Sequence, residues 1–195
     1  IINPRNRYPE GMYGVFSDLL EFVSWLDHQV VELILSLRHP VLTKLMTSVT
    51  GLGSATAALV FLGICYLADW EEELYTSALA LAITGIVVGT LMTTIQRPFP
   101  PGPVCMTGGT DTVATSFPSG HAAAVTVYAM AARESSVLPF GVVSILAGTI
   151  ALSRIYLGTH YFSDTVGGVL IGVGAFYAAT RLRRCTLVAQ ITSDR

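Results

Sequence analysis

Charged side chains are scarce in this sequence of 195 residues. Only 12% of the residues are Asp, Glu, Lys or Arg, whereas an ordinary soluble domain has roughly 25%. Hydrophobic residues make up 52%, and the mean hydropathy is +0.60. A soluble domain of this length needs more charge to cover its surface, so we expect much of the surface to face lipid. The length indicates one domain.

An excess of basic residues is missing too. Eleven Lys and Arg residues against 13 Asp and Glu residues give a net charge of −2, which argues against nucleic acid as a partner. Cysteine is rare, and Cys65, Cys105 and Cys185 lie far apart without metal-ligand spacing. We therefore expect free thiols, not a disulfide framework or a zinc ribbon.

Long apolar runs predict five membrane-spanning helices. They cover about Gly51–Asp69, Tyr75–Ile95, Ser119–Glu134, Val137–Leu157 and Tyr161–Thr180. A helix rises ~1.5 Å per residue, so crossing ~30 Å of hydrocarbon takes roughly 20 residues. The third run is the shortest, and Ser119 and Arg133 are expected at its two interfaces. Gly168 and Gly172 have the spacing of small residues at close helix contacts in lipid.

The first fifty residues have a different pattern. From Leu26 to Leu37 the apolar positions follow one helical face, and Pro40 separates this helix from a second one. Helices with one apolar face and several charges typically lie in the membrane interface; a sixth span from Tyr13 onward is the alternative. The prediction is an all-α, polytopic membrane helix bundle of five to six spans with N-terminal amphipathic helices. Its segments are 1–50 (N-terminal), 51–185 (catalytic bundle) and 186–195 (tail).

Polar residues distant in the sequence are predicted to converge on one membrane face. The second span ends there, the third starts there, the fourth returns there, and the fifth begins after a short turn. This path brings together five residues: Arg97, His121, Arg154, His160 and Asp164. Polar residues within spans are costly and commonly functional. The long connector 98–118, rich in Pro and Gly, lies beside them and is expected to act as a lid or binding loop.

These residue types suit phosphate chemistry. Arginine forks match phosphate oxygens, and a helix that begins at Ser119 and Gly120 presents backbone N–H groups to an anion. His160 and Asp164 are four residues apart, so on one helix the carboxylate could hold one imidazole nitrogen and leave the other as nucleophile or base. His121, from another helix, could act as the acid.

The residues resemble the signature of the type 2 phosphatidic acid phosphatase superfamily. Its second part is complete as Pro118-Ser119-Gly120-His121, and its third part as Ser153-Arg154 followed by His160 and Asp164. The first part is partial, since Arg97-Pro98 are present but Thr90 stands at the lysine position. The resemblance covers about residues 51–180.

The resemblance implies a six-helix fold with an active site at one membrane surface, a lipid substrate in the bilayer, and neither metal nor cofactor. It assigns His160 as the nucleophile that forms a phosphohistidine, oriented by Asp164, and His121 as the acid. The phosphoryl oxygens are assigned to Arg97, Arg154, Ser119 and the Gly120 amide. Thr90 removes one basic phosphate ligand from this set.

Three alternatives differ in class. A zinc hydrolase could use His121, His160 and Asp164, but it has no need of the two arginines. A lipid-binding or transport protein could keep the phosphate site without turnover, although binding alone needs only the cations. The related vanadium haloperoxidases are soluble, unlike this composition. Which lipid phosphate is the substrate, and the oligomeric state, stay open.

The location follows from the charges near the span ends. A slight excess of arginine on the face opposite the site favours that face as cytoplasmic. The chain is thus expected to be a multi-pass protein of the plasma membrane with an extracytoplasmic active site.

Overall fold

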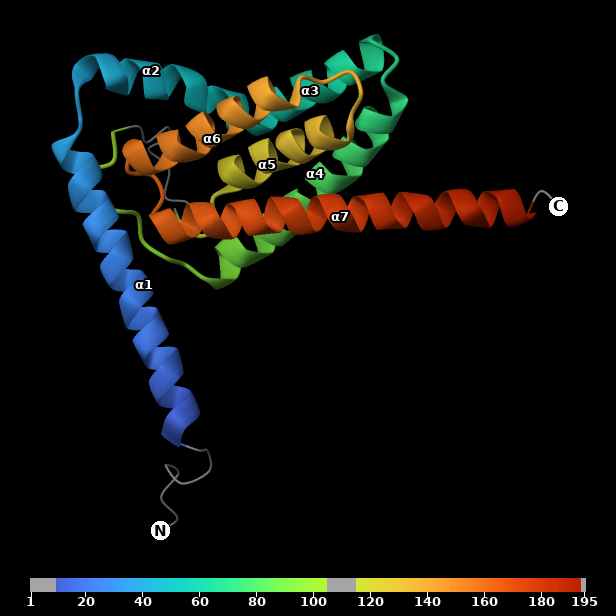
Figure 1. Ribbon diagram of the computed structural model, residues 1–195. Coiled ribbons are helices and arrows are strands. Elements are labelled where there is room, and N and C mark those ends of the chain that lie inside the picture. Colours follow the sequence, from blue (N-terminus) through green and yellow to red (C-terminus); the bar gives the residue numbers. More distant parts are fainter. Residues whose placement is uncertain (1–9, 105–114, 194–195) are drawn as a thin grey trace.

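The protein is built from helices that follow one another along the chain. The computed structural model describes residues 10–104 and 115–193. The elements are α1 (Glu10–Ser36), α2 (Pro40–Thr50), the short 3-10 helix η2 (Gly51–Gly53), α3 (Ala55–Leu67), α4 (Glu71–Thr94), α5 (Gly120–Glu134), α6 (Phe140–Tyr156) and α7 (Phe162–Ser193). The predicted all-α class is confirmed (Figure 1).

Helix α5 forms the centre of the bundle, because it packs against α4, α6 and α7. Its many alanines let the neighbours approach closely. A buried cluster joins α4, α5 and α7 through Ala80, Val127, Met130, Ala131, Phe176 and Ala179. Gly168 and Gly172 of α7 face α5 so closely that a Cβ on Gly172 would lie 2.5 Å from the Ala123 carbonyl oxygen. The predicted close helix contact at these two glycines is therefore confirmed.

Two helices of the described chain are long and apolar enough to cross a membrane, namely α4 and the Phe162–Cys185 part of α7. A third span results if α2 with η2 and α3, which meet at a bend of 58°, count as one. Helices α5 and α6 lie where the sequence predicts spans but have 15 and 17 residues, fewer than the roughly 20 that cross the hydrocarbon directly. The number of five to six spans stays a prediction.

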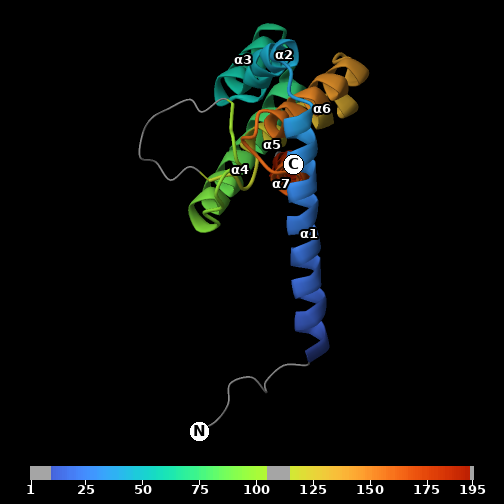
Figure 2. The ribbon, with the colours of Figure 1, turned by 90° about the vertical axis from the view of Figure 1, so that its left-hand side faces the viewer.

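The N-terminal segment differs from the sequence prediction. Helix α1 is one continuous helix of 27 residues, whereas the predicted interfacial helix covers only its part from Leu26 onward and the alternative span begins at Tyr13. Large apolar side chains along it are exposed, among them Leu19, Phe22 and Trp25. Figures 1 and 2 show most of α1 projecting from the bundle, crosswise to α7. The second N-terminal helix, α2, begins at Pro40, just after the predicted break.

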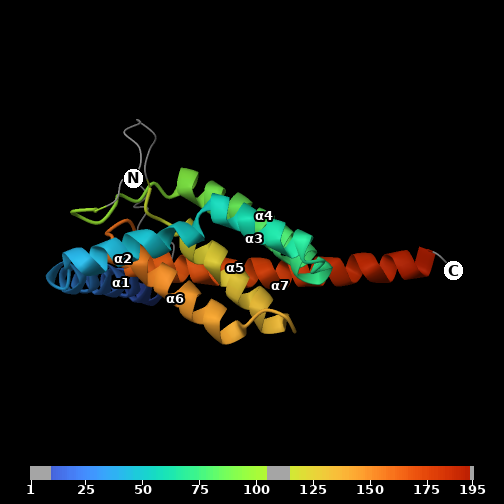
Figure 3. The same cartoon turned by 90° about the horizontal axis from the view of Figure 1, so that it is seen from above.

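The bundle has one end where several helix termini meet. Figures 1 and 3 show the start of α5, the end of α6 and the start of α7 at the same end, near α2 and the C-terminal part of α1. At the opposite end α7 extends beyond the other helices. Figure 3 also shows α3 beside α4 along one side of the bundle, and α5 and α6 along the opposite side. The residues of interest lie at the end where the termini meet.

Candidate active site

Three helix termini position the predicted site residues. Ser119 caps α5, since its side chain accepts a hydrogen bond from Ala122 N at 3.4 Å. Its own backbone N–H donates to the Asp164 carbonyl oxygen at 3.0 Å, which ties the start of α5 to the first turn of α7. Arg154 lies in the last turn of α6. The predicted convergence of these segments is therefore present in the structure.

His160 lies in the turn between α6 and α7 and is buried. Its Nδ1 is 2.5 Å from the Ser116 carbonyl oxygen. A carbonyl can only accept, so Nδ1 carries the proton and Nε2 keeps its lone pair. Burial, the Arg154 cation and His121 lower the pKa of His160 to about 3, and the bond to Ser116 opposes this only in part. The imidazole is thus neutral at physiological pH.

His121 and Arg154 lie near enough to His160 to lower its pKa. Arg154 also donates to Thr50 Oγ1 at 3.0 Å from the end of α2. The His121 ring lies against η2, where a Cβ on Gly53 would be 3.0 Å from the ring. The 3-10 turn therefore lies against one side of His121, and a side chain at Gly53 would force Ile150 or His121 to shift.

The expected pairing of His160 with Asp164 is absent. Asp164 instead accepts from Arg97 Nη1 at 2.5 Å and from Tyr161 N at 2.8 Å. The physical reason is the position of the helix start. Because α7 begins at Phe162, His160 precedes the helix, and the four-residue spacing no longer places the two side chains on one face.

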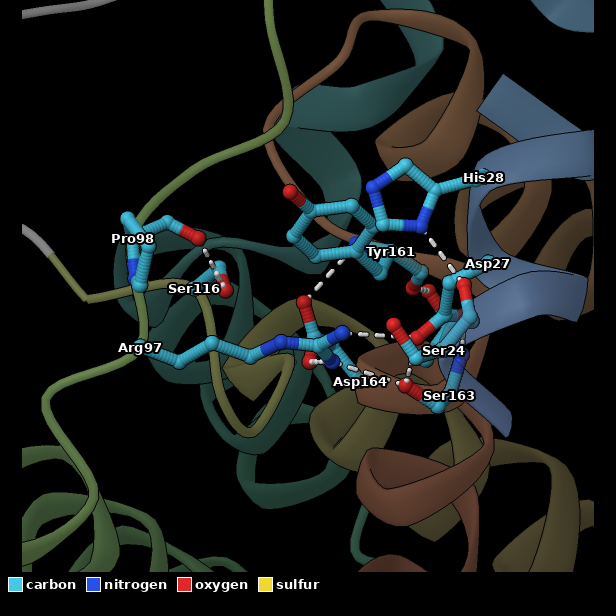
Figure 4. Close-up of polar contacts among 10 residues, drawn as sticks. Ser24, Asp27, His28, Arg97, Pro98, Ser116, Tyr161, Ser163 and Asp164 are labelled. Carbon is cyan, nitrogen blue, oxygen red and sulfur yellow. Dashed lines mark hydrogen bonds and ion pairs between the residues drawn. The ribbon is translucent and has the colours of Figure 1, made fainter. Parts of the chain in front are cut away.

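Arg97 is held by two acidic residues. Besides Asp164, its guanidinium donates from Nη2 to Asp27 at 2.7 Å, and the Tyr161 ring covers it at 4.1 Å. Figure 4 shows the Arg97 side chain reaching between the two carboxylates. Burial by itself lowers the pKa of Arg97, but both carboxylates outweigh this effect and raise it. Arg97 therefore stays charged, on the carboxylate side of the site.

Sequence reasoning missed Asp27 and Ser163. The fully buried Asp27 of α1 accepts from Ser163 N at 2.9 Å and from Ser163 Oγ at 2.6 Å. The apolar face predicted from Leu26 to Leu37 leaves Asp27 on the polar side of an interfacial helix. A signal did exist, since an ionisable residue within an apolar helix is commonly functional, but nothing in the sequence indicated its partner.

The described ends of the long connector are bonded to each other and to the end of α6. Ser116 N donates to the Arg97 carbonyl oxygen at 2.8 Å, and Ser116 Oγ donates to the Pro98 carbonyl oxygen at 3.0 Å (Figure 4). On the other side, Val104 N donates to the Leu157 carbonyl oxygen at 2.9 Å. The predicted lid also includes residues 105–114, Cys105 among them, which lie outside the described residues.

Thr90, at the position of the signature lysine, does not contact these residues through its hydroxyl. Its Oγ1 donates to the Ile86 carbonyl oxygen at 2.8 Å, within α4, and the residue is exposed. The basic side chains placed at this end of the bundle by the signature are therefore Arg97 and Arg154.

The zinc alternative requires His121, His160 and Asp164 to converge on one ion. Within residues 10–104 and 115–193, no three His, Cys, Asp or Glu side chains form a group that could hold a metal ion. The Asp164 carboxylate is engaged by Arg97 and Tyr161 N, so the donor set does not fit a His2Asp zinc site.

An apolar cavity of about 610 Å³ lies between α3, α5 and α6. Its lining includes Phe61, Tyr128, Val143 and Ile150, and it extends to Gly51 and Leu52 of η2. Ile150 is also the residue nearest to a Cβ built on Gly53, at 2.9 Å, beside the His121 ring. One end of the cavity thus lies near His121.

Fold and site together define a helical membrane protein with paired histidines and arginines at one end of its bundle. Comparison with known proteins gives the family: the PAP2 superfamily matches residues 73–185. The chain belongs to this superfamily, and its helices and membrane-spanning relatives indicate an integral membrane protein.

Two similar proteins of known function are phosphatases. Over 119 residues the chain is 32% identical to a decaprenylphosphoryl-5-phosphoribose phosphatase of Mycobacterium tuberculosis, covering 60% of this chain and 66% of that protein. Over 169 residues it is 30% identical to phosphatidylglycerophosphatase B of Bacillus subtilis, covering 77% of this chain and 80% of that protein.

Two crystal structures share the fold. Aquifex aeolicus LpxE is 25% identical, with a TM-score of 0.67 over 78% of this chain and 93% of that one. A transmembrane PAP2-type phosphatidylglycerolphosphate phosphatase from Bacillus subtilis is 21% identical, with a TM-score of 0.72 over 83% of this chain and 86% of that one.

Proposed function

We propose that the protein is a metal-independent lipid phosphate phosphatase that works through a phosphohistidine at His160. The observation that carries this proposal is the state of His160, a buried neutral imidazole whose Nδ1 is fixed by the Ser116 carbonyl oxygen. The unprotonated Nε2 is the lone pair that a nucleophile needs. Arg154 lies beside it, as the chemistry of a phosphoryl group requires.

The reaction has two steps. The Nε2 lone pair of His160 attacks phosphorus, the ester P–O bond breaks, and His121 gives its proton to the leaving alkoxide. Water then attacks the phosphohistidine and returns a proton to His121, which releases inorganic phosphate and the free imidazole. Arg97, Arg154, Ser119 and the Gly120 amide hold the phosphoryl oxygens during both steps.

Asp164 contributes by a different route from the one predicted. Its carboxylate binds the backbone N–H of Tyr161, the residue after His160, and the guanidinium of Arg97. It therefore orients the turn that carries the nucleophile, not the imidazole itself. The intact set of nucleophile and acid favours turnover over binding or transport alone, since binding needs only the cations.

The substrate we propose is a long-chain lipid phosphate with its phosphate at the histidine pair. The named activities of the relatives, on a polyprenyl-linked phosphate and on phosphatidylglycerophosphate, support this class. The apolar cavity between α3, α5 and α6 can hold part of the lipid's hydrocarbon chain near His121. Monophosphate and diphosphate substrates both suit this arrangement.

The proposed setting is the plasma membrane, with five to six spans and the site facing outward. If α7 crosses the bilayer, α1 lies along the membrane surface, because the two run crosswise (Figure 1). Its exposed Leu19, Phe22 and Trp25 suit burial at the level of the headgroups.

Phosphate release in detergent tests the function. The panel contains phosphatidic acid, phosphatidylglycerophosphate, polyprenyl phosphate and polyprenyl diphosphate. Wild type should hydrolyse at least one of these, EDTA should leave its rate unchanged, and His160→Ala should lose essentially all turnover while extracting normally. Activity that EDTA abolishes and zinc restores would contradict the proposal, as would full activity in His160→Ala.

A chain-length comparison tests the cavity. Val143 lines it, while the adjacent Val142 is 57% exposed on the same helix. Val143→Trp should raise KM for the long-chain substrate but not for a soluble chromogenic phosphate ester, and Val142→Trp should change neither. Equal effects of Val143→Trp on both substrates would remove the lipid chain from this cavity.

A further inference from the structure

Helix α1 delivers one charged side chain into the bundle. Asp27 is fully buried and accepts three hydrogen bonds, one from Arg97 and two from Ser163. A carboxylate has about four acceptor sites, so this one is nearly saturated. Its donors come from two distant places, the segment after α4 and the first turn of α7.

Stability alone gives a poor reason for this aspartate. Burying an ion pair costs desolvation, and well-packed apolar residues of similar volume are often as stable. The rest of α1 offers such residues, since Leu19, Phe22 and Trp25 are apolar and exposed. The helix instead buries a carboxylate where it contacts a signature arginine.

The contact with Asp27 divides the guanidinium of Arg97 between two carboxylates. Nη2 donates to Asp27, while Nη1 donates to Asp164 and to Ser163 Oγ. Without Asp27, both nitrogens can turn to Asp164 and form a bidentate pair, the geometry that arginine and a carboxylate favour. Asp164 would then have to share the oxygen that now accepts from Tyr161 N at 2.8 Å.

We propose that Asp27 is a positioning residue of the active site, which holds Arg97 and the first turn of α7 in the arrangement that binds the phosphoryl group. Arginine has five N–H donors, and three of Arg97's go to these partners within the described residues. The two others serve the phosphate. Helix α1 is thereby part of the catalytic unit, although it lies outside the family signature.

This inference rests on the proposed function, and kinetics in detergent test it. Asp27→Asn keeps the shape but removes the charge that holds Arg97. We expect KM for the lipid phosphate and the inhibition constant of orthovanadate to rise roughly tenfold or more, the loss of a charge-assisted contact, with a smaller change in kcat. Asp27→Glu should restore part of the affinity. In an Arg97→Lys background, Asp27→Asn should add little, since the two side chains act together.

Asp18→Asn is the matched control, because Asp18 is an exposed acidic residue of the same helix. If Asp27→Asn has the kinetics of Asp18→Asn, or lowers KM, the positioning role is refuted; a lower KM would mean that Asp27 competes with phosphate for Arg97. Should Asp27→Asn not extract as a folded protein, Asp27→Glu and Ser163→Ala weaken the same contact more mildly and decide by the same constants. Absence of turnover in wild type would instead refute the proposed function.

Discussion

Arg154 helps to keep the proposed nucleophile neutral, second only to burial. Burial and the Arg154 cation lower the pKa of His160 to about 3, so the imidazole stays neutral over most of the acidic range. Replacing the cation removes one cause of the lowering, so the pKa must rise. In Arg154→Gln the acidic limb of kcat/KM should move to higher pH, in addition to a lower rate. A pH–rate profile from pH 3 to 9 measures this.

Two controls belong to that profile. Asp164→Asn should leave the acidic limb in place, because Asp164 does not contact the imidazole. Unfolding must also be followed at each pH, because the lowered pKa of His160 makes stability depend on pH. Between pH 6.5, the ordinary pKa of histidine, and about pH 3, the unfolded chain binds more protons than the folded protein. The free energy of unfolding therefore falls as the pH drops through this window. An acidic limb that does not move in Arg154→Gln would contradict the assignment.

Thr90 marks a missing cation. Its hydroxyl bonds within α4, so it adds no charge to the site, whereas a lysine there could extend toward the phosphate. Thr90→Lys should lower KM, or the inhibition constant of inorganic phosphate, by the factor that corresponds to a charge-assisted contact of roughly 1–2 kcal/mol. Inhibition assays with phosphate measure the change. Weaker phosphate inhibition would mean that the space near Thr90 belongs to the substrate.

The pairing of α5 with α7 depends on two glycines of α7. A Cβ on Gly172 would lie 2.5 Å from a backbone oxygen of α5, whereas one on Gly174 meets nothing within 4 Å. Gly172→Ala should therefore lower the unfolding temperature in detergent, because overpacking costs about 1–3 kcal/mol of stability. Gly174→Ala, the control on the same helix, should be neutral or stabilising by up to about 1 kcal/mol. Equal unfolding temperatures for the two variants would contradict the close packing.

Packing of this kind and the order of the helices were accessible from the sequence. The apolar runs gave the positions of α4 to α7, and following the chain from end to end brought Arg97, His121 and His160 to one face. The partners of Asp164 were not accessible, because they depend on α7 starting two residues after His160. The role of Asp27 could not be predicted for a similar reason, because only the way α1 packs against the bundle places Asp27 beside Arg97.

Orientation in the bilayer concerns the whole chain. Cys185 is exposed at the end of the apolar part of α7, opposite the candidate active site. If the site faces outward, Cys185 is on the cytoplasmic side, where a membrane-impermeant thiol reagent cannot reach it. In a background with Cys65→Ser and Cys105→Ser, intact cells should show no labelling, and lysed cells should show full labelling. Labelling of intact cells would reverse the orientation.

The covalent intermediate is the most direct test of the account. Wild-type protein in detergent is mixed with the lipid phosphate that it hydrolyses, quenched under alkaline conditions during turnover, digested and analysed by mass spectrometry. The account predicts a phosphoryl group on the peptide that contains His160, on the ring nitrogen distal to Ser116, and none in His160→Ala. Rapid turnover with no phosphorylated His160, or a phosphoryl group on another residue, would contradict it.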